Sequence, residues 1–175
     1  MTPTSDRRLP EALAAALTVP FDHEDGRGID FEPFPDFLSA EDTTDWLRAW
    51  TGNTEVSGDE FRVFGQDGTG GYAAFWLVRP GRPLIDQPVV FLGSEGETCV
   101  VARDLGDFLW LLAGGLGPWE AATPYGSDPS PRPSRRLTAV AERFAPERQR
   151  PATAVVERAV REFPDFDDTV MALCR

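Results

Sequence analysis

Apolar residues recur along the chain at helical spacing near both ends and in short continuous runs in the middle. Positions 10–18 combine a proline suited to a first helical turn with a Leu/Ala run, which predicts a short helix ending before Pro20. Farther on, Ser39 is followed three positions later by Asp42, and Gly52 closes a run with helical periodicity. A second helix is therefore predicted between Ser39 and Gly52. Its apolar stripe is Thr43, Trp46, Leu47 and Trp50.

Four runs of β-branched and aromatic residues follow, separated by Gly, Pro and Asp turns. They lie at 61–64, 72–78, 89–92 and 98–102. Because the connections are too short for a parallel crossover, the strands are predicted to be antiparallel. Asp104 then caps a predicted helix with one apolar stripe, which ends at Gly114.

The pattern near the end of the chain predicts helices. Residues 117–133 hold five prolines and two glycines without periodicity, which predicts a loop. Two helical stripes follow, and Pro164 separates them from a last short helix. The stripes are Leu137, Val140, Ala141 and Phe144, then Val156, Ala159, Val160 and Phe163. They must cover either the free face of the sheet or the partner in a dimer.

These elements predict a single α+β domain, with a mainly antiparallel sheet of about four to six strands and extra C-terminal helices. Residues 1–116 form the core with an acidic N-terminal segment, 117–134 a proline-rich loop, and 135–175 a helical tail packing on the core. Within the core, 20–38 is interpreted as a loop pinned by phenylalanines. These are Phe21, Phe31, Phe34 and Phe37.

Charge changes this picture more than overall composition does. The chain has 175 residues, 41% hydrophobic and 26% charged, as expected of a folded globular protein. Residues 1–120 carry a net charge of −13 and residues 121–175 a net charge of +1, while 22–60 alone carry −10. Such a field repels nucleic acid and anionic lipid and attracts basic proteins. The alternative is that the acids only keep the protein soluble.

The apolar stretch near the start is short and interrupted by Pro10 and Glu11, so it predicts neither a signal peptide nor a membrane span. We therefore expect a cytoplasmic protein whose Cys99 and Cys174 stay reduced. The two cysteines have no metal-ligand spacing, and no metal or cofactor is predicted.

Catalytic chemistry finds little support in the sequence. His23 is the only histidine, and it lies in a polar stretch without a surrounding motif. Among 29 acidic residues no pair stands out for carboxylate chemistry, so no catalytic residue is assigned and a carboxylate-dependent hydrolase stays an alternative.

The glycine-rich stretch after Phe64 is interpreted as a tight hairpin turn. A phosphate-binding loop would lead into a helix and usually bring a basic residue, whereas this stretch carries Asp67 and leads into the strand at Tyr72. Gly68, Gly70 and Gly71 are assigned to this turn, and positive φ is expected at Gly70 or Gly71.

Three segments in order resemble the SUKH superfamily. They are the glycine-rich hairpin entering an aromatic strand at 64–76, a proline-led strand ending near acids at 88–97, and a strand leading into a Phe/Leu helix at 101–112. The helix at 44–53, with its Asn/Gly end, is similar to the family's as well. The resemblance covers about residues 38–114. It implies an α+β fold and, for bacterial members, immunity proteins that bind and neutralise toxins, often nucleases; fungal relatives regulate cell-wall synthesis through protein contacts.

We therefore predict a protein that binds a protein partner, a basic toxin domain. An enzyme, a nucleic-acid-binding protein and a membrane protein are not predicted. The chain is expected to be a monomer or a homodimer. A scaffolding protein without a toxin is the alternative. The predicted contacts are Glu41, Asp42 and Asp45 on the capped helix. Trp46 and Trp50 are interpreted as core, whereas one of Trp76 and Trp110 is expected to be partly exposed as an apolar anchor. Trp119, which follows Pro118 in the predicted loop, is a third candidate with the same two interpretations.

Overall fold

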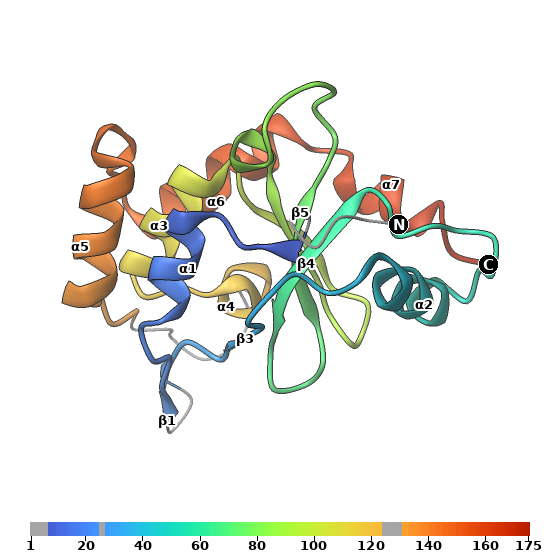
Figure 1. The fold of residues 1–175 in the computed structure, drawn as a ribbon, viewed down its shortest axis with the longest axis horizontal. Helices are drawn as coiled ribbons and strands as arrows, with labels where there is room; N and C mark the ends of the chain where they lie inside the picture. The colour runs from blue at the N-terminus through green and yellow to red at the C-terminus, as the bar shows by residue number, and fades with distance from the viewer. Residues whose placement is uncertain (1–6, 25–26, 124–130) are drawn as a thin grey trace.

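The computed structural model describes residues 7–24, 27–123 and 131–175, and an antiparallel meander lies at its centre (Figure 1). The five strands stand side by side in sequence order. They are β3 (Glu32–Pro33), β4 (Phe61–Gln66), β5 (Tyr72–Trp76), β6 (Val89–Leu92) and β7 (Thr98–Ala102). A separate two-stranded ribbon joins β1 (His23–Glu24) to β2 (Arg27–Gly28). Together with the helices, this confirms the predicted α+β class.

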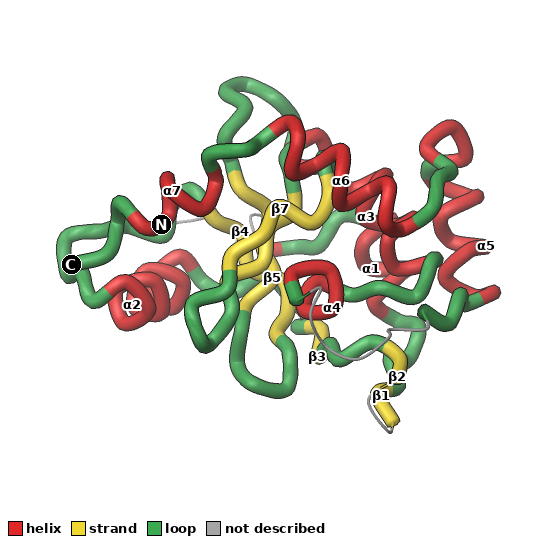
Figure 2. Tube along the Cα trace, turned by 180° about the vertical axis from the view of Figure 1, so that it is seen from behind, coloured by secondary structure: helices red, strands yellow, loops and turns green. Residues whose placement is uncertain are grey.

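Seven α-helices surround the sheet in the described residues (Figure 2). They are α1 (Glu11–Leu17), α2 (Ala40–Thr51), α3 (Leu105–Ala113), α4 (Pro118–Ala122), α5 (Arg135–Phe144), α6 (Ala152–Glu162) and α7 (Phe166–Met171). The described residues also contain the short 3₁₀ turns η2 (Leu84–Asp86) and η3 (Pro146–Arg148).

The helix ends follow local chemistry. Ser39 accepts a hydrogen bond from the Asp42 backbone N–H at 3.0 Å, and Gly52 ends α2 in the left-handed region at φ 66°. Asp104 caps α3 in the same way, through the Asp107 backbone N–H at 2.8 Å. These predicted boundaries are confirmed.

Both faces of the sheet are buried, which explains why the strands read as continuous apolar runs instead of alternating ones. On one face Phe64, Phe75 and Phe91 pack with α1, α3 and α5. On the other, Val63 and Trp76 pack with residues from α2, α6 and α7. Figure 1 shows α1, α3 and α5 on one side of the sheet and α2 and α7 on the other.

The C-terminal helices pack on their own chain. α5 lies against α3 and α1, and α6 runs along β7, where it covers the edge of the sheet. The predicted stripe of α6 is wrong in part, because Val155 and Ala159 are fully buried whereas Val160 is 47% exposed. The face that turns inward carries Ala152, Val155 and Ala159, and Ala152 approaches α3 so closely that a Cβ on Gly114 would lie 2.7 Å from the Cβ of Ala152.

Two further expectations need correction. The stretch 117–134 was expected to hold no element, yet α4 begins there with Pro118 at its first turn; residues 124–130 lie outside the described part. The stretch 20–38 contains the short strands β1 to β3. Its Phe31 and Phe37 are buried, at 7% and 1% exposure, so the expected pinning by aromatic side chains is confirmed for these two.

The predicted hairpin joins β4 to β5, and Gly70 has the expected positive φ, at 92°. Asp67 organises the turn, since its carboxylate accepts hydrogen bonds from the backbone N–H groups of Thr69 at 3.2 Å and Gly71 at 2.7 Å. Gly71 has no positive φ; there a Cβ would lie 2.6 Å from the Phe91 ring. None of the helices in the described ranges is both long and apolar enough to span a membrane.

Candidate partner-binding surface

Helix α2 turns its acidic side chains to solvent. Glu41, Asp42 and Asp45 are all exposed. Glu41 and Asp42 lie in the first turn, where carboxylates interact favourably with the helix dipole. Asp45 follows one turn after Glu41, so the three side chains form one continuous acidic strip.

Aromatic side chains lie directly beside this strip. Trp46 of α2 stacks on Tyr72 of β5, with ring centroids 4.5 Å apart and planes inclined by 24°. Phe34 meets the other side of this group, edge-on to Tyr72 at 6.0 Å, and Trp50 lies 6.4 Å from Trp46. All four rings are partly exposed. Aromatic rings that combine a packed body with an accessible face are typical anchors at protein interfaces.

The aromatic group is held in place by the turns around it. Trp50 Nε1–H donates to the Gly93 carbonyl oxygen at 2.7 Å, which ties α2 to the end of β6. In the neighbouring turn the hydroxyl groups of Ser94 and Thr69 are hydrogen-bonded at 3.0 Å. A fixed set of rings loses little conformational entropy when a partner binds.

Acids and rings form one surface because Asp42 precedes Trp46 by one helical turn. The same proximity affects the pKa of Tyr72. Burial raises it above the ordinary value, and the negative charge of Asp42 raises it further. We call this set the acidic–aromatic surface. It consists of Glu41, Asp42, Asp45, Phe34, Trp46, Trp50 and Tyr72.

Sequence reasoning had placed the apolar anchors elsewhere. Trp76 and Trp110 are only 8% and 5% exposed, so the expectation that one of them is accessible is wrong. Trp76 packs on Phe166 with ring centroids 4.8 Å apart, and Trp110 Nε1–H donates to the Ala145 carbonyl oxygen at 2.7 Å. Both belong to the core, in opposite layers of it.

Trp119 is partly exposed on α4, edge-on to His23 at 6.4 Å between ring centroids, and is not part of the acidic–aromatic surface. The interpretation of Trp46 and Trp50 as core also needs correction, because both stay partly exposed. Their spacing with Asp42 was visible in the sequence. The position of Tyr72 was not, since it follows from the tertiary packing of α2 on the sheet.

Three acids outside this surface, Glu120, Asp67 and Glu162, have structural partners. The carboxylate of Glu120 accepts hydrogen bonds from the backbone N–H groups of Gly117 at 3.0 Å and Asp30 at 2.7 Å. Burial is the main cause that raises its pKa, although these hydrogen bonds oppose the shift. Asp67 organises the hairpin turn, and Glu162 joins Arg79 and Arg103 in an ion-pair cluster. These contacts explain the three acids as parts of the fold.

The cysteines and acids give no metal site in the residues that the structure describes, where no three candidate ligands come together. Cys99 is a partly buried free thiol and Cys174 an exposed one. Burial raises the pKa of Cys99 to about 11, so this thiol stays protonated near neutral pH and is a poor ligand and nucleophile.

We predict that neither a chelator nor a reductant changes the melting temperature by more than about 1 °C, because no cross-link or ion is expected to hold the fold. Differential scanning fluorimetry with EDTA and with dithiothreitol measures this directly. Stoichiometric metal in the purified protein, or a lower melting temperature after reduction, contradicts the prediction.

Comparison with protein-family models, with curated proteins and with solved structures finds no match.

Proposed function

We propose that this chain is a non-catalytic binding domain that captures and neutralises a basic toxin, in the manner implied by its resemblance to bacterial SUKH immunity proteins. The observation that carries the proposal is the acidic–aromatic surface. Its exposed carboxylates Glu41, Asp42 and Asp45 provide long-range attraction, and the Trp46/Tyr72 stack provides an apolar anchor beside them. Interfaces of high affinity commonly combine these two features.

The charge distribution supports a basic partner over a nucleic acid or an anionic membrane. Residues 22–60, which include α2, carry a net charge of −10. A surface of this sign accelerates the encounter with a positively charged protein and slows that with a polyanion. A nuclease toxin has a positive surface for its own substrate, so an acidic inhibitor fits that class of toxin well.

Identifying the partner comes first. The chain is co-expressed with the proteins encoded beside its gene and purified by affinity. A large secreted protein with a basic C-terminal domain is the expected partner. Co-expression should then restore growth to cells producing that toxin domain. Tight binding to a neighbouring protein without protection from toxicity would instead support the scaffolding alternative.

We predict that the double variant Glu41→Arg/Asp45→Arg associates with this partner about tenfold more slowly, because charges at the rim of an interface act mainly on the association rate. The salt dependence of that rate should also weaken. Stopped-flow or surface-plasmon measurements from low to physiological ionic strength test both effects. Since the two side chains are exposed, the fold should stay intact.

The matched control is Glu142→Arg/Glu157→Arg, which changes the net charge by the same amount at exposed positions of α5 and α6. We expect it to alter the association rate much less. If both double variants slow association equally, net charge rather than the α2 surface governs encounter, and the proposed surface is wrong.

A further inference from the structure

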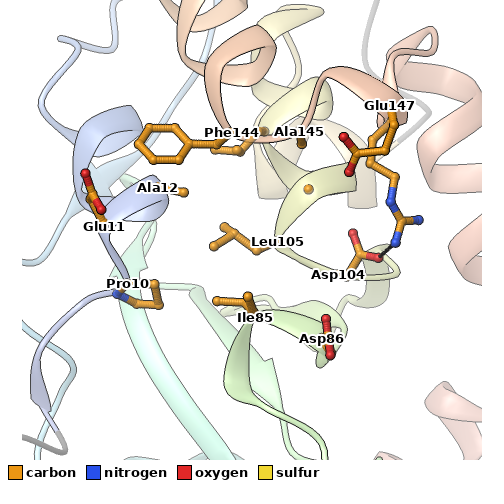
Figure 3. A pocket seen from close by; sticks show the side chains of 13 residues that line it. Pro10, Glu11, Ala12, Ile85, Asp86, Asp104, Leu105, Phe144, Ala145 and Glu147 are labelled. Carbon is orange, nitrogen blue, oxygen red and sulfur yellow. Dashed lines mark ion pairs between the residues drawn. The ribbon is translucent and has the colours of Figure 1, made fainter.

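A pocket of about 330 Å³ lies between α1, η2, the start of α3 and the end of α5. Figure 3 shows its two kinds of lining: Ala12, Leu105 and Phe144 form the apolar part, and Asp86 and Glu147 lie to one side. Its volume is at the small end of the range for ligand sites, roughly 300–1,000 Å³. That size suits one or two side chains better than a cofactor.

The apolar lining includes Ile85, which is 49% exposed and the most exposed large hydrophobic residue of the described chain. It lies on η2 next to Leu105, and both residues line the pocket (Figure 3). An exposed aliphatic side chain beside a preformed hollow marks a place where a partner gains by covering apolar surface.

The walls of the pocket are fixed by hydrogen bonds. Gln87, 3% exposed, accepts from the Arg79 backbone N–H at 2.9 Å and donates to the Arg79 carbonyl oxygen at 2.7 Å, which holds the loop that carries η2. On the opposite wall Arg148 contacts Asp104 at 2.7 Å between side-chain N and O atoms. A pocket that exists before binding requires little reorganisation.

Charge defines what this pocket accepts. The lining contains four carboxylates, from Glu11, Asp86, Asp104 and Glu147, and one arginine, Arg148. The cation of Arg148 is already matched by Asp104, and the fully buried Asp107 lies 3.8 Å from it. No ion pair is recorded for Glu147 among the described residues, and Asp86 has only an exposed pair with Arg82 at 3.6 Å. Exposed pairs of this kind are weak and exchange easily.

We propose that this pocket is a second binding site, which takes an apolar side chain followed by basic residues in a peptide segment of a protein partner. The apolar side chain packs between Leu105, Phe144 and Ile85, and the cations meet Asp86 and Glu147. This site lies on the α1, α3 and α5 side of the sheet, away from α2 (Figure 1). It therefore does not depend on the acidic–aromatic surface binding anything.

The test is an amide NMR titration with the blocked peptide Gly-Leu-Arg-Arg-Gly. Shifts should saturate and cluster at Ala12, Ile85, Leu105 and Gly106, which line the pocket. A peptide with Ser in place of Leu, and another with Glu in place of both Arg, should each bind at least about tenfold more weakly. Shifts confined to α2, or equal binding by the Ser peptide, would mean that only nonspecific charge attraction operates and would overturn the proposal.

Ile85→Arg provides the second arm, since it removes the apolar wall and adds a repelling charge. We expect at least about a tenfold rise in the dissociation constant of the peptide. Val160→Arg is its matched control, because Val160 is 47% exposed on α6 and does not line the pocket. Both variants change exposed positions, and circular dichroism checks their folding. Unchanged affinity in Ile85→Arg, or an equal loss in Val160→Arg, rules the pocket out.

Discussion

Replacing Tyr72 with alanine should weaken binding of the basic partner by about 30-fold or more, which corresponds to ~2 kcal/mol, the usual threshold for an interface hot spot. We expect this large effect because Tyr72 interacts with three other residues of the acidic–aromatic surface. It stacks on Trp46, meets Phe34 edge-on, and lies within the field of Asp42. Its removal deletes an anchor and also leaves the Trp46 ring without its stacking partner.

Two controls separate this effect from loss of stability. Tyr72→Phe keeps the ring and should keep most of the affinity. Val155→Ala removes a fully buried side chain from α6, at a cost of about 2 kcal/mol of unfolding free energy, and should leave the affinity unchanged well below the melting temperature. Calorimetric titration of the three variants measures the dissociation constants. An affinity loss in Val155→Ala equal to that in Tyr72→Ala would show that stability, not contact, is being measured.

The fold was predictable where local chemistry decides it. Ser39 and Gly52 mark the two ends of α2, and Asp104 marks the start of α3. These ends are predictable because capping hydrogen bonds join groups within three or four positions of the helix end. The four main strands were found at nearly their observed limits, since β-branched and aromatic runs between turn residues allow few other structures. The antiparallel order followed from short connections.

The prediction failed where the structure depends on contacts between residues that are far apart in the sequence. Helix α4 carries Glu120, whose carboxylate accepts a hydrogen bond from the Asp30 backbone N–H 90 positions away. The buried face of α6 includes Ala152, which packs closely against Gly114 of α3, whereas Val160 is 47% exposed. The α6 contact leaves no mark in the local pattern, whereas α4 has local signals in Pro118 at its first turn and in Glu120 three positions after Gly117.

The candidate site shows the same division. The acids of α2 were chosen from the helix pattern, and the structure places all three in solvent. Two of the three tryptophans chosen as apolar anchors, Trp76 and Trp110, are buried, because side-chain spacing does not tell how deeply a ring is buried. Trp76 was a candidate for partial exposure from its place in a strand, but α7 covers that face and its Phe166 packs on the ring.

Gly71→Val should cost about 3 kcal/mol of unfolding free energy, the largest loss among the hairpin glycines. A Cβ at this position would lie 2.6 Å from Phe91 Cζ and 3.0 Å from Gly93 Cα. The Phe91 ring is 1% exposed and packed in the core, so it has no room to move aside. The added branched side chain therefore separates β5 from β6 at their end.

The neighbouring glycines provide a graded series in the same turn. Gly70 has φ 92° but nothing within 4 Å of a Cβ, so Gly70→Val should cost ~1–2 kcal/mol from backbone strain alone. At Gly68 the nearest atoms are the carboxylate oxygens of Asp30 at 3.1 Å, at the end of a flexible side chain, and Gly68→Ala should cost less than about 1 kcal/mol.

Urea denaturation of the three variants gives the free energies, and a double-mutant cycle identifies the cause at Gly71. If the clash with the ring is responsible, Phe91→Leu should cost less in the Gly71→Val background than in the parent, since the smaller side chain relieves the contact. Backbone strain, by contrast, predicts additive costs, because shortening Phe91 does not change φ. Additivity in the cycle, or a larger loss for Gly70→Val than for Gly71→Val, would show that backbone conformation, and not the lack of space next to β6, is the reason for glycine in this turn.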